Sequence, residues 1–410
     1  MPRVLLLLPT TTYRTPDFLE AAARLGVEVT VASEEPSTLE RLNPDGLLTL
    51  NLRDPDAAAR RALAFAASHP IDAVVGVDED ATVAAAAIAA SLGLRHNPVE
   101  AVRAARNKAV MRRRLEEAGV PAPRHRLHSL DEDPTDAARA ASYPCVLKPT
   151  FLAASRGVIR ANDEAEFLGA WRRIAAILAD PDVARRGGEA AREILVEEFL
   201  PGDEVAVEGL LEAGRLLVLA LFDKPDPLNG PYFEETIYVT PSRLAQRTQS
   251  RIASVASAAA TALGLVDGPI HAELRVRGEE AWILEIAARS IGGLCSRTLR
   301  FGTGLSLEEL ILRHALGRTV DGLARESRAA GVMMIPIPHA GVLEGVEGLD
   351  DARAVPEISD LTISAHPGQT LVPLPEGSHY LGFLFARAKT PAEVEAALRE
   401  AHGRLLFRIG

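Results

Sequence analysis

The sequence has few cysteines and no excess of basic residues over its 410 positions. Its two thiols, Cys145 and Cys295, are too few and too distant in sequence for a disulfide framework or a thiolate zinc site, which favours a reducing cytosol. The formal net charge of -11 argues against nucleic-acid or membrane-surface binding, because these anionic partners bind positively charged protein surfaces. An anionic ligand remains compatible with this charge where Lys and Arg side chains converge locally.

Long apolar runs are also missing. The stretch that follows Met1 stops at Pro9 and is too short for a signal peptide, and the alanine-rich segment 81–94 is too short to span a bilayer. The N-terminal part contains no Gly-rich dinucleotide fingerprint and no phosphate loop ending in Gly-Lys-Ser/Thr, which argues against a plain dehydrogenase. We therefore expect a cytoplasmic protein that is not attached to a membrane.

The N-terminal part does contain alternating strand and helix patterns, and a hydrophobic share of 47% allows several domains with cores of their own. Strands are predicted at 4–8, 27–32 and 71–77, and helices at 17–25, 55–68 and 82–92. This order implies parallel βαβ units. The loops 9–12 and 78–80 would then follow the carboxyl ends of strands, where open α/β sheets bind ligands.

The segment 268–293 is the most informative part of the chain. Two alternating strand patterns, joined by a Gly-Glu-Glu turn, predict a hairpin with Glu273 and Glu285 on one face and Arg289 just beyond the second strand. Mg²⁺ prefers carboxylate oxygens completed by water and phosphate, and a nearby arginine can stabilise a transferring phosphoryl group. A solvated acidic hairpin is the alternative interpretation, and the other motifs favour phosphoryl transfer.

Two lysines lie where they can meet phosphates. An amphipathic helix is predicted from Arg106 to a stop at Gly119, and Lys108 in its first turn is unfavourable near the positive helix end unless an anion lies nearby. A small lobe is predicted to follow, with strands and helices at 124–128, 133–141, 144–148, 157–160, 163–178 and 194–199. Lys148 ends one of these strands, where it can meet phosphate oxygens or, alternatively, extend into solvent.

Two loops of this region suit a nucleotide. The small-residue turn 150–157 can fold over phosphates with its backbone amides, Ser155 and Arg156. At the Pro-Gly break that follows residue 200, the backbone can pair with an adenine edge, while Glu197 and Glu204 can accept hydrogen bonds from an amine and from ribose hydroxyls. Acids that flank a turn are otherwise simply solvated.

In order and spacing, these motifs resemble the ATP-grasp family over about residues 1–320. The motifs are Lys108, Lys148, the break at 197–204, Glu273, Glu285 and Arg289. The resemblance implies an α/β and α+β multi-domain fold in which ATP lies between a small lid lobe and a larger C-terminal lobe. It divides the chain into an N-terminal parallel α/β domain at 1–105, a lid region with a leading helix at 106–200, a catalytic lobe at 201–325 and a C-terminal subdomain at 326–410.

The same resemblance implies a role for each matched position. Lys108, Lys148 and Ser155 would contact phosphates, Glu197 and the backbone of Glu198, Phe199 and Leu200 the adenine, and Glu204 the ribose. Glu273 and Glu285 would hold one or two Mg²⁺ ions, for which Mn²⁺ could substitute, and Arg289 and Lys148 would act at the transferred phosphate. Ala287 stands where the family often has a metal-binding Asn, so one ligand for a second ion is absent.

The remaining segments bear on the substrate. The charged, Pro-rich loop 222–236 has the length and composition of a binding loop, or equally of a surface loop. Glu234 or Glu235 could receive an amino group, while Arg289 and Arg297, near Gly292 and Gly293, could orient a carboxylate bidentately. With the tail patterns at 332–337, 341–345, 380–388 and 391–402, this region resembles the carboxylate–amine ligase branch that includes L-amino acid ligases.

The resemblance implies an ATP-dependent ligase in which a small carboxylate attacks the γ-phosphorus and an amine attacks the resulting acyl phosphate. The oligomeric state is left open, and a homodimer is one of the alternatives. The alternatives are a biotin-carboxylase-like or purine-pathway carboxylating enzyme, and a nucleotide-binding regulator without turnover, which Ala287 motivates. No Ser/His/Asp or Cys/His signature is evident, and His96, His271 and His339 are interpreted as structural or surface residues.

Overall fold

The computed structural model describes residues 1–10, 12–320 and 322–410. The N-terminal domain contains a four-stranded parallel sheet in the order β3-β2-β1-β4. Its elements are β1 (Arg3–Leu7), α1 (Thr15–Leu25), β2 (Glu28–Ser33), β3 (Leu47–Thr49), α2 (Pro55–Ala66), β4 (Ala73–Gly76), the 3₁₀ helix η1 (Glu79–Ala81) and α3 (Thr82–Ser91). The predicted βαβ units are confirmed. The short strand β3 was not predicted, because its three residues are too few to show an alternation.

Two helices, α4 (Val99–Arg106) and α5 (Lys108–Glu117), connect this domain to the next lobe. The expectation of a single helix from Arg106 is wrong, because Asn107 adopts an extended conformation and caps α5 by accepting hydrogen bonds from the amides of Ala109 and Val110. Arg106 therefore ends α4. Lys108 becomes the first residue of α5, in the first turn as predicted.

The small lobe, called the lid below, contains an antiparallel sheet in the order β5-β8-β6-β7. Its elements are β5 (His125–Ser129), α6 (Pro134–Ala140), β6 (Cys145–Pro149), β7 (Ile159–Ala161), α7 (Glu164–Leu178), α8 (Pro181–Gly187), η2 (Gly188–Arg192) and β8 (Glu193–Glu198). The predicted strands and helices are confirmed. Helix α8 was not predicted, because Val183 is its single buried residue and leaves no apolar periodicity in the sequence.

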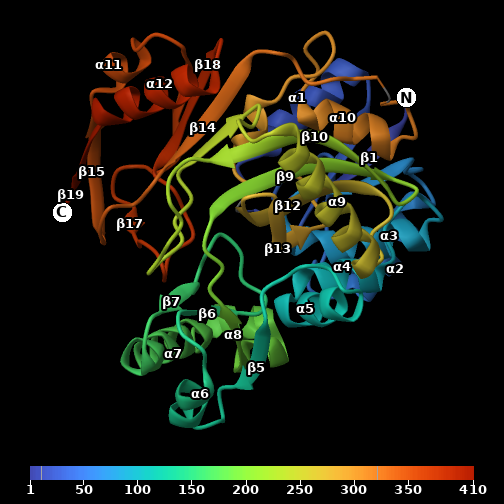
Figure 1. Ribbon diagram of the computed structural model, residues 1–410. Coiled ribbons are helices and arrows are strands. Elements are labelled where there is room, and N and C mark those ends of the chain that lie inside the picture. Colours follow the sequence, from blue (N-terminus) through green and yellow to red (C-terminus); the bar gives the residue numbers. More distant parts are fainter. Residues whose placement is uncertain (11, 321) are drawn as a thin grey trace.

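The largest sheet has eight strands in the order β13-β12-β9-β10-β11-β14-β18-β16 (Figure 1). Its strands are β9 (Asp203–Glu212), β10 (Arg215–Lys224), β11 (Ile237–Thr240), β12 (Gly268–Arg277), β13 (Glu280–Ala287), β14 (Ala329–Ile335), β16 (Ile358–Ile363) and β18 (Gly382–Ala388). Because β14, β16 and β18 continue the sheet, the segments 201–325 and 326–410 share one layer. The division of the chain into four parts therefore remains a proposal.

Helices cover this sheet, and a smaller sheet follows it. The helices are α9 (Gln246–Leu263), α10 (Leu307–Ala315), α11 (Leu349–Arg353) and α12 (Pro391–Gly403), with the 3₁₀ helix η3 (Cys295–Thr298). The smaller sheet, in the order β17-β15-β19, contains β15 (Gly341–Glu347), β17 (Thr370–Leu371) and β19 (Leu406–Ile409). Within the described ranges, no helix has the length and hydropathy needed to cross a membrane.

The lid contacts the C-terminal part of the chain. In Figure 1 the lid lies below the large sheet and is connected to it by few segments. The Gly157 N–H donates to the Pro375 carbonyl over 2.8 Å, and the Arg173 guanidinium donates to the Glu376 carboxylate over 2.9 Å. These contacts join the turn 150–157 and helix α7 of the lid to the segment between β17 and β18.

The N-terminal domain is joined to the large sheet by a buried ion pair. Arg14 is 1% exposed, and its guanidinium lies 2.9 Å from the Glu308 carboxylate of α10. The same guanidinium donates to the Ser290 hydroxyl and the Ile291 carbonyl, at 2.8 and 3.1 Å. Arg14 thereby fixes the chain that follows β13.

Replacing Arg14 tests this connection. Arg14→Met should lower the free energy of unfolding by about 3–5 kcal/mol, because it leaves the Glu308 carboxylate buried without its cation. Urea unfolding monitored by circular dichroism measures the change. Arg408→Met is the control, since it breaks an ion pair whose two side chains are exposed and should change stability by less than about 1 kcal/mol. Equal losses in the two variants would contradict the assignment.

Candidate active site

One cavity of about 400 Å³ lies between the lid and the large sheet. It is lined by loops after β1 and β4, the turn 150–157, the break after β8, the hairpin β12–β13 and the segment 378–380. Most of the predicted site residues line it, namely Lys108, Lys148, Ser155, Glu197, Glu198, Phe199, Leu200, Glu204, Glu235, Glu273, Glu285, Arg289, Gly292 and Gly293. The predicted position of the ligand site at the carboxyl ends of parallel strands agrees with this placement.

Two predicted substrate residues lie outside the cavity lining. Arg297 belongs to η3, where its guanidinium lies 3.1 Å from the Asp17 carboxylate of α1 and 3.5 Å from that of Asp360. Glu234 precedes Glu235 in the loop, and only Glu235 reaches the lining. The sequence pattern could not distinguish these neighbours, because both are acidic. We leave Arg297 and Glu234 out of the proposed substrate site.

The two glutamates predicted to bind metal face each other across the hairpin. Glu273 of β12 and Glu285 of β13 are direct partners in the antiparallel register, as the alternation predicted. Their side chains are 24% and 27% exposed, toward the cavity. Oxygen donors on one open face fit a small hard cation such as Mg²⁺. Ala287 pairs with His271 next to them and supplies no oxygen donor.

Three cations line the same cavity as this carboxylate pair. The Lys108 ammonium lies 3.1 Å from the Glu285 carboxylate and donates to the Leu152 carbonyl over 2.7 Å, so it has the anionic partner that its place in the first helical turn requires. The Arg289 Nε donates to the Glu79 carboxylate over 2.8 Å. Lys148 also lines the cavity, from the end of β6. The cavity therefore combines cations suited to phosphate with carboxylates suited to a metal.

Glu197 forms ion pairs with two buried cations. Its carboxylate is 2% exposed and lies 2.6 Å from the Arg112 guanidinium and 2.6 Å from the Lys148 ammonium. Burial alone would raise the pKa of Glu197, but Arg112 and Lys148 outweigh it and hold that pKa at about 2. Burial lowers the pKa of Lys148, and the Glu197 carboxylate offsets part of this decrease. In this structure the Glu197 side chain fixes Lys148, and its predicted contact with adenine remains a proposal.

The break after β8 offers a place for a planar base. The Glu198 side chain points away to Arg124, from which it accepts hydrogen bonds of 3.0 and 2.8 Å. Within the described chain, the Leu200 N–H has no backbone acceptor, so it is available to a ligand. Phe199 and Phe233 pack with an apolar cluster that also contains Val146, Val158 and Leu228. An apolar wall beside an unpaired amide is suited to an adenine ring.

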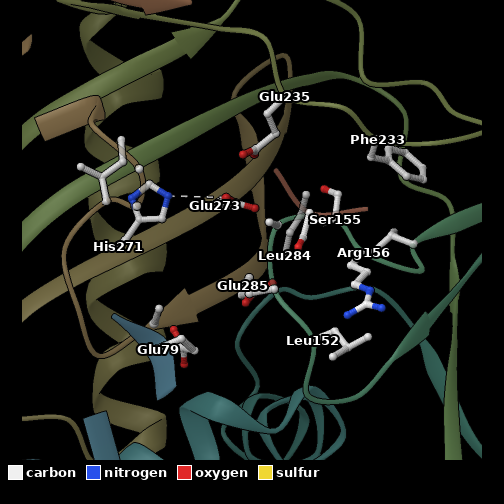
Figure 2. Close-up of a pocket in the computed structure, with 18 of the residues that line it drawn as sticks. Glu79, Leu152, Ser155, Arg156, Phe233, Glu235, His271, Glu273, Leu284 and Glu285 are labelled. Carbon is white, nitrogen blue, oxygen red and sulfur yellow. Dashed lines mark ion pairs between the residues drawn. The ribbon is translucent and has the colours of Figure 1, made fainter. Parts of the chain in front are cut away.

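The cavity floor contains His271, which the sequence interpretation did not assign to the site. His271 is buried, with its Nδ1 3.2 Å from the Glu208 carboxylate and its Nε2 3.5 Å from that of Glu273; Figure 2 shows the latter ion pair. His271 was interpreted as a structural or surface residue; it is buried between two carboxylates and also lines the cavity, whereas His96 and His339 are exposed. Burial would lower the pKa of His271, but the Glu208 and Glu273 carboxylates raise it to about 9.

The lid contributes the opposite wall. In Figure 2, Leu152, Ser155 and Arg156 lie across the cavity from His271 and Glu273. Ala154 and Ser155 both have a φ of 54°, a left-handed conformation that turns the backbone sharply at this point. Burial and the nearby Arg186 lower the pKa of Arg156. This part of the cavity therefore has a concentration of positive charge that a phosphate would neutralise.

Known proteins share this architecture. Models of three families match the chain: an ATP-grasp N-terminal domain at 19–96, an ATP-grasp domain at 141–298 and an L-amino acid ligase C-terminal domain 2 at 333–410. The crystal structure of L-amino acid ligase from Bacillus licheniformis superposes with a TM-score of 0.85 and 28% identity, covering 100% of this chain and 99% of that one.

Two curated enzymes are similar over part of their length. Alanine–anticapsin ligase of Bacillus subtilis is 30% identical over 234 residues, which are 54% of this chain and 49% of that enzyme. Carnosine synthase 1 of Homo sapiens is 26% identical over 401 residues, which are 93% of this chain and 47% of that enzyme. The chain thus spans about half the length of these relatives.

The fold and the matched domains define the class, and the chain belongs to the ATP-grasp superfamily of ligases. The C-terminal match and the L-amino acid ligase structure narrow the class further. Within the superfamily, the chain belongs to the carboxylate–amine ligase branch. Both parts of the predicted resemblance are confirmed.

The buried pair of Glu197 with Lys148 makes stability depend on pH. Because the folded pKa of about 2 lies below the ordinary 4.5, Glu197 contributes roughly 3 kcal/mol at neutral pH, and this contribution is lost as the pH falls from 4.5 toward 2. Glu197→Gln should therefore lower the free energy of unfolding by about that amount at pH 7. The difference from the wild type should shrink below about pH 4.5.

Urea unfolding at a series of pH values measures this difference. Glu198→Gln is the matched control on the same strand, because its partner Arg124 is largely exposed and the change should stay below about 1 kcal/mol. A Glu197→Gln loss that stays constant down to acidic pH would mean that its charge is not what stabilises the fold.

Proposed function

We propose that this protein is an ATP-dependent carboxylate–amine ligase that forms an amide or peptide bond through an acyl phosphate. One observation carries the proposal: Glu273 and Glu285 face each other across a hairpin, in a cavity that Lys108, Lys148 and Arg289 also line. A dicarboxylate beside three cations is the arrangement that phosphoryl transfer from a magnesium triphosphate needs.

The nucleotide would lie between the lid and the large sheet. Its base would occupy the apolar wall at Phe199, with the Leu200 N–H as hydrogen-bond donor and Glu204 near the ribose. Lys108 and Lys148 would offset the negative charge of the phosphates, with Ser155 and the amides of its turn above them. Phosphate oxygens would compete with Glu285 for Lys108, because an ammonium has three donors and can bind both.

The cofactor Mg²⁺, or Mn²⁺ in its place, would be held by Glu273 and Glu285. When bound, it supplies positive charge at the phosphate oxygens and orients them for attack. The remaining coordination positions would be filled by water and phosphate, which Mg²⁺ accepts readily.

Two displacements would make the bond. A carboxylate oxygen of the acid attacks the γ-phosphorus, the bond from that phosphorus to the bridging oxygen breaks, and ADP leaves with an acyl phosphate remaining. The amine nitrogen then attacks the acyl carbon, phosphate leaves with the carbon–oxygen bond electrons, and the nitrogen loses a proton. Arg289 would stabilise charge on the transferred phosphoryl group, and the lid would exclude water that otherwise hydrolyses the intermediate.

We propose a small acid, such as an amino acid, and an amine as the substrates. Glu235 would receive an amino group, next to Arg289 and the Gly292–Gly293 turn, all of which line the cavity. The similarity to L-amino acid ligase supports this substrate class. A cytoplasmic location and a homodimer remain part of the proposal.

A phosphate-release assay with panels of acids and amines tests the function. Release that requires both an acid and an amine is expected, and mass spectrometry should find the amide. Release that requires bicarbonate instead would favour a carboxylating enzyme. ATP binding without release under any condition would favour a regulator, which the missing oxygen donor at Ala287 keeps under consideration.

Glu285→Gln should reduce turnover by about 10²–10³-fold, because it removes a charged metal ligand beside the developing phosphate charge. Steady-state kinetics measures the loss, and circular dichroism checks that the fold is kept. Glu280→Gln is the matched control, since this exposed glutamate lies on the same strand outside the cavity. Turnover near that of the wild type in Glu285→Gln would contradict the metal assignment.

Lys148→Ala should weaken ATP binding by about tenfold or more, since it removes a buried ammonium from the phosphate region. Isothermal titration calorimetry with ATP and Mg²⁺ measures the dissociation constant. Lys389→Ala, which removes an exposed lysine far from the cavity lining, should leave it unchanged. Unchanged affinity in Lys148→Ala would assign this lysine a purely structural role beside Glu197.

A further inference from the structure

Lys224, the last residue of β10, lies directly behind the cavity floor. Its side chain is 2% exposed. Its ammonium is 2.7 Å from the Glu204 carboxylate and 3.5 Å from that of Glu273, and it donates to Glu235 as well. The three glutamates line the cavity, whereas Lys224 is not among the described lining residues. Lys224 therefore contacts the site through these three acids and through Tyr238, which also lines the cavity.

The three acids come from separate parts of the chain. Glu204 is the second residue of β9, Glu235 lies in the loop before β11, and Glu273 lies in β12. One carboxylate oxygen of each lies within 4.8 Å of the others. Three carboxylates at this spacing repel one another strongly in a poorly solvated place, so they stay together only around a cation.

The surroundings of Lys224 are arranged for a single compact cation. The Tyr238 ring centre lies 4.9 Å from the ammonium, in the geometry of a cation–π contact. The Arg275 guanidinium neutralises Glu204 from its other side, at 3.2 Å, and His271 contacts Glu273. The ammonium thus occupies the centre of the acid cluster, while the other two cations lie at its edge.

We infer that Lys224 is a positioning residue, an internal cation that keeps Glu204, Glu235 and Glu273 in one arrangement and excludes a divalent ion from the space between them. Glu273 is thereby left to act with Glu285 on its cavity side. The predicted ribose, amine and metal positions would consequently depend on one ammonium that touches no ligand. The roles of the three glutamates rest on the proposed function, whereas their contacts with Lys224 do not.

Removing the internal cation should create a new metal site. Lys224→Met leaves three carboxylates with space between them, and it should bind one more Mn²⁺ per chain than the wild type in the absence of nucleotide. Electron paramagnetic resonance of free Mn²⁺ counts the bound ions. Lys224→Arg keeps the charge and should bind the same number as the wild type, and so should the exposed control Lys389→Met. An unchanged count in Lys224→Met overturns the inference.

A second pair of variants keeps the test decisive if Lys224→Met does not fold. Lys224→Met combined with Glu235→Gln removes one cation and one anion, and it is compared with Glu235→Gln alone. Without Lys224, Glu204 loses its nearest cation, so ATP binding measured by calorimetry should be about tenfold weaker in the double variant than in Glu235→Gln. Equal ATP affinity in the two variants overturns the positioning role.

These measurements do not depend on the ligase reaction. If no acid and amine pair releases phosphate with the wild type, the proposed function fails, while the Mn²⁺ count and the ATP affinity still decide whether Lys224 positions the three acids. If turnover is normal and both measurements are unaffected by the variants, the inference about Lys224 fails alone.

Discussion

The structure depends on the pairing of buried carboxylates with buried cations around one cavity. A carboxylate removed from water is costly unless a cation and hydrogen bonds replace its hydration, so each buried acid here has a partner. Lys224 forms ion pairs with Glu204 and Glu235, and Arg112 forms one with Glu197. This arrangement lets the cavity keep acids close together without bulk water. In the proposed function, a triphosphate with its metal would add charges of both signs, and this preformed set of acids and cations would stabilise them.

Helix α5 is the element through which the two walls of the cavity meet. Lys108 at its start contacts Glu285 of β13 and also the Leu152 carbonyl of the lid. One turn later, Arg112 donates to the Leu284 carbonyl over 2.6 Å while its Nε pairs with Glu197 of β8. The helix therefore connects the hairpin suited to a metal with β8, whose Glu197 forms an ion pair with Lys148 of β6. The same two side chains, Lys108 and Arg112, therefore contact both walls.

Sequence reasoning identified features that depend on local patterns and missed those that depend on distant partners. The register of Glu273 against Glu285 follows from alternation and a short turn, both of which are visible within twenty residues or so. Lys224 shows no such pattern, since its partners lie up to about fifty positions away. The contact of His271 with Glu208 is equally hard to predict, because only the pairing of β12 with β9 brings the two residues together. Burial and charge pairing are properties of the assembled sheet, and no short motif encodes them.

The cross-strand pair of His271 and Ala287 bears on the number of metal ions. Position 287 faces the same side of the hairpin as Glu285, two residues earlier, so an oxygen-bearing side chain there would add a ligand next to the carboxylates. Alanine supplies none, and its partner His271 is held by Glu208 and Glu273. An ion held between Glu273 and Glu285, as proposed, would therefore have two protein ligands. A second ion would have Glu285 as its protein ligand and would need water and phosphate oxygens for the rest, which makes its binding depend on the nucleotide.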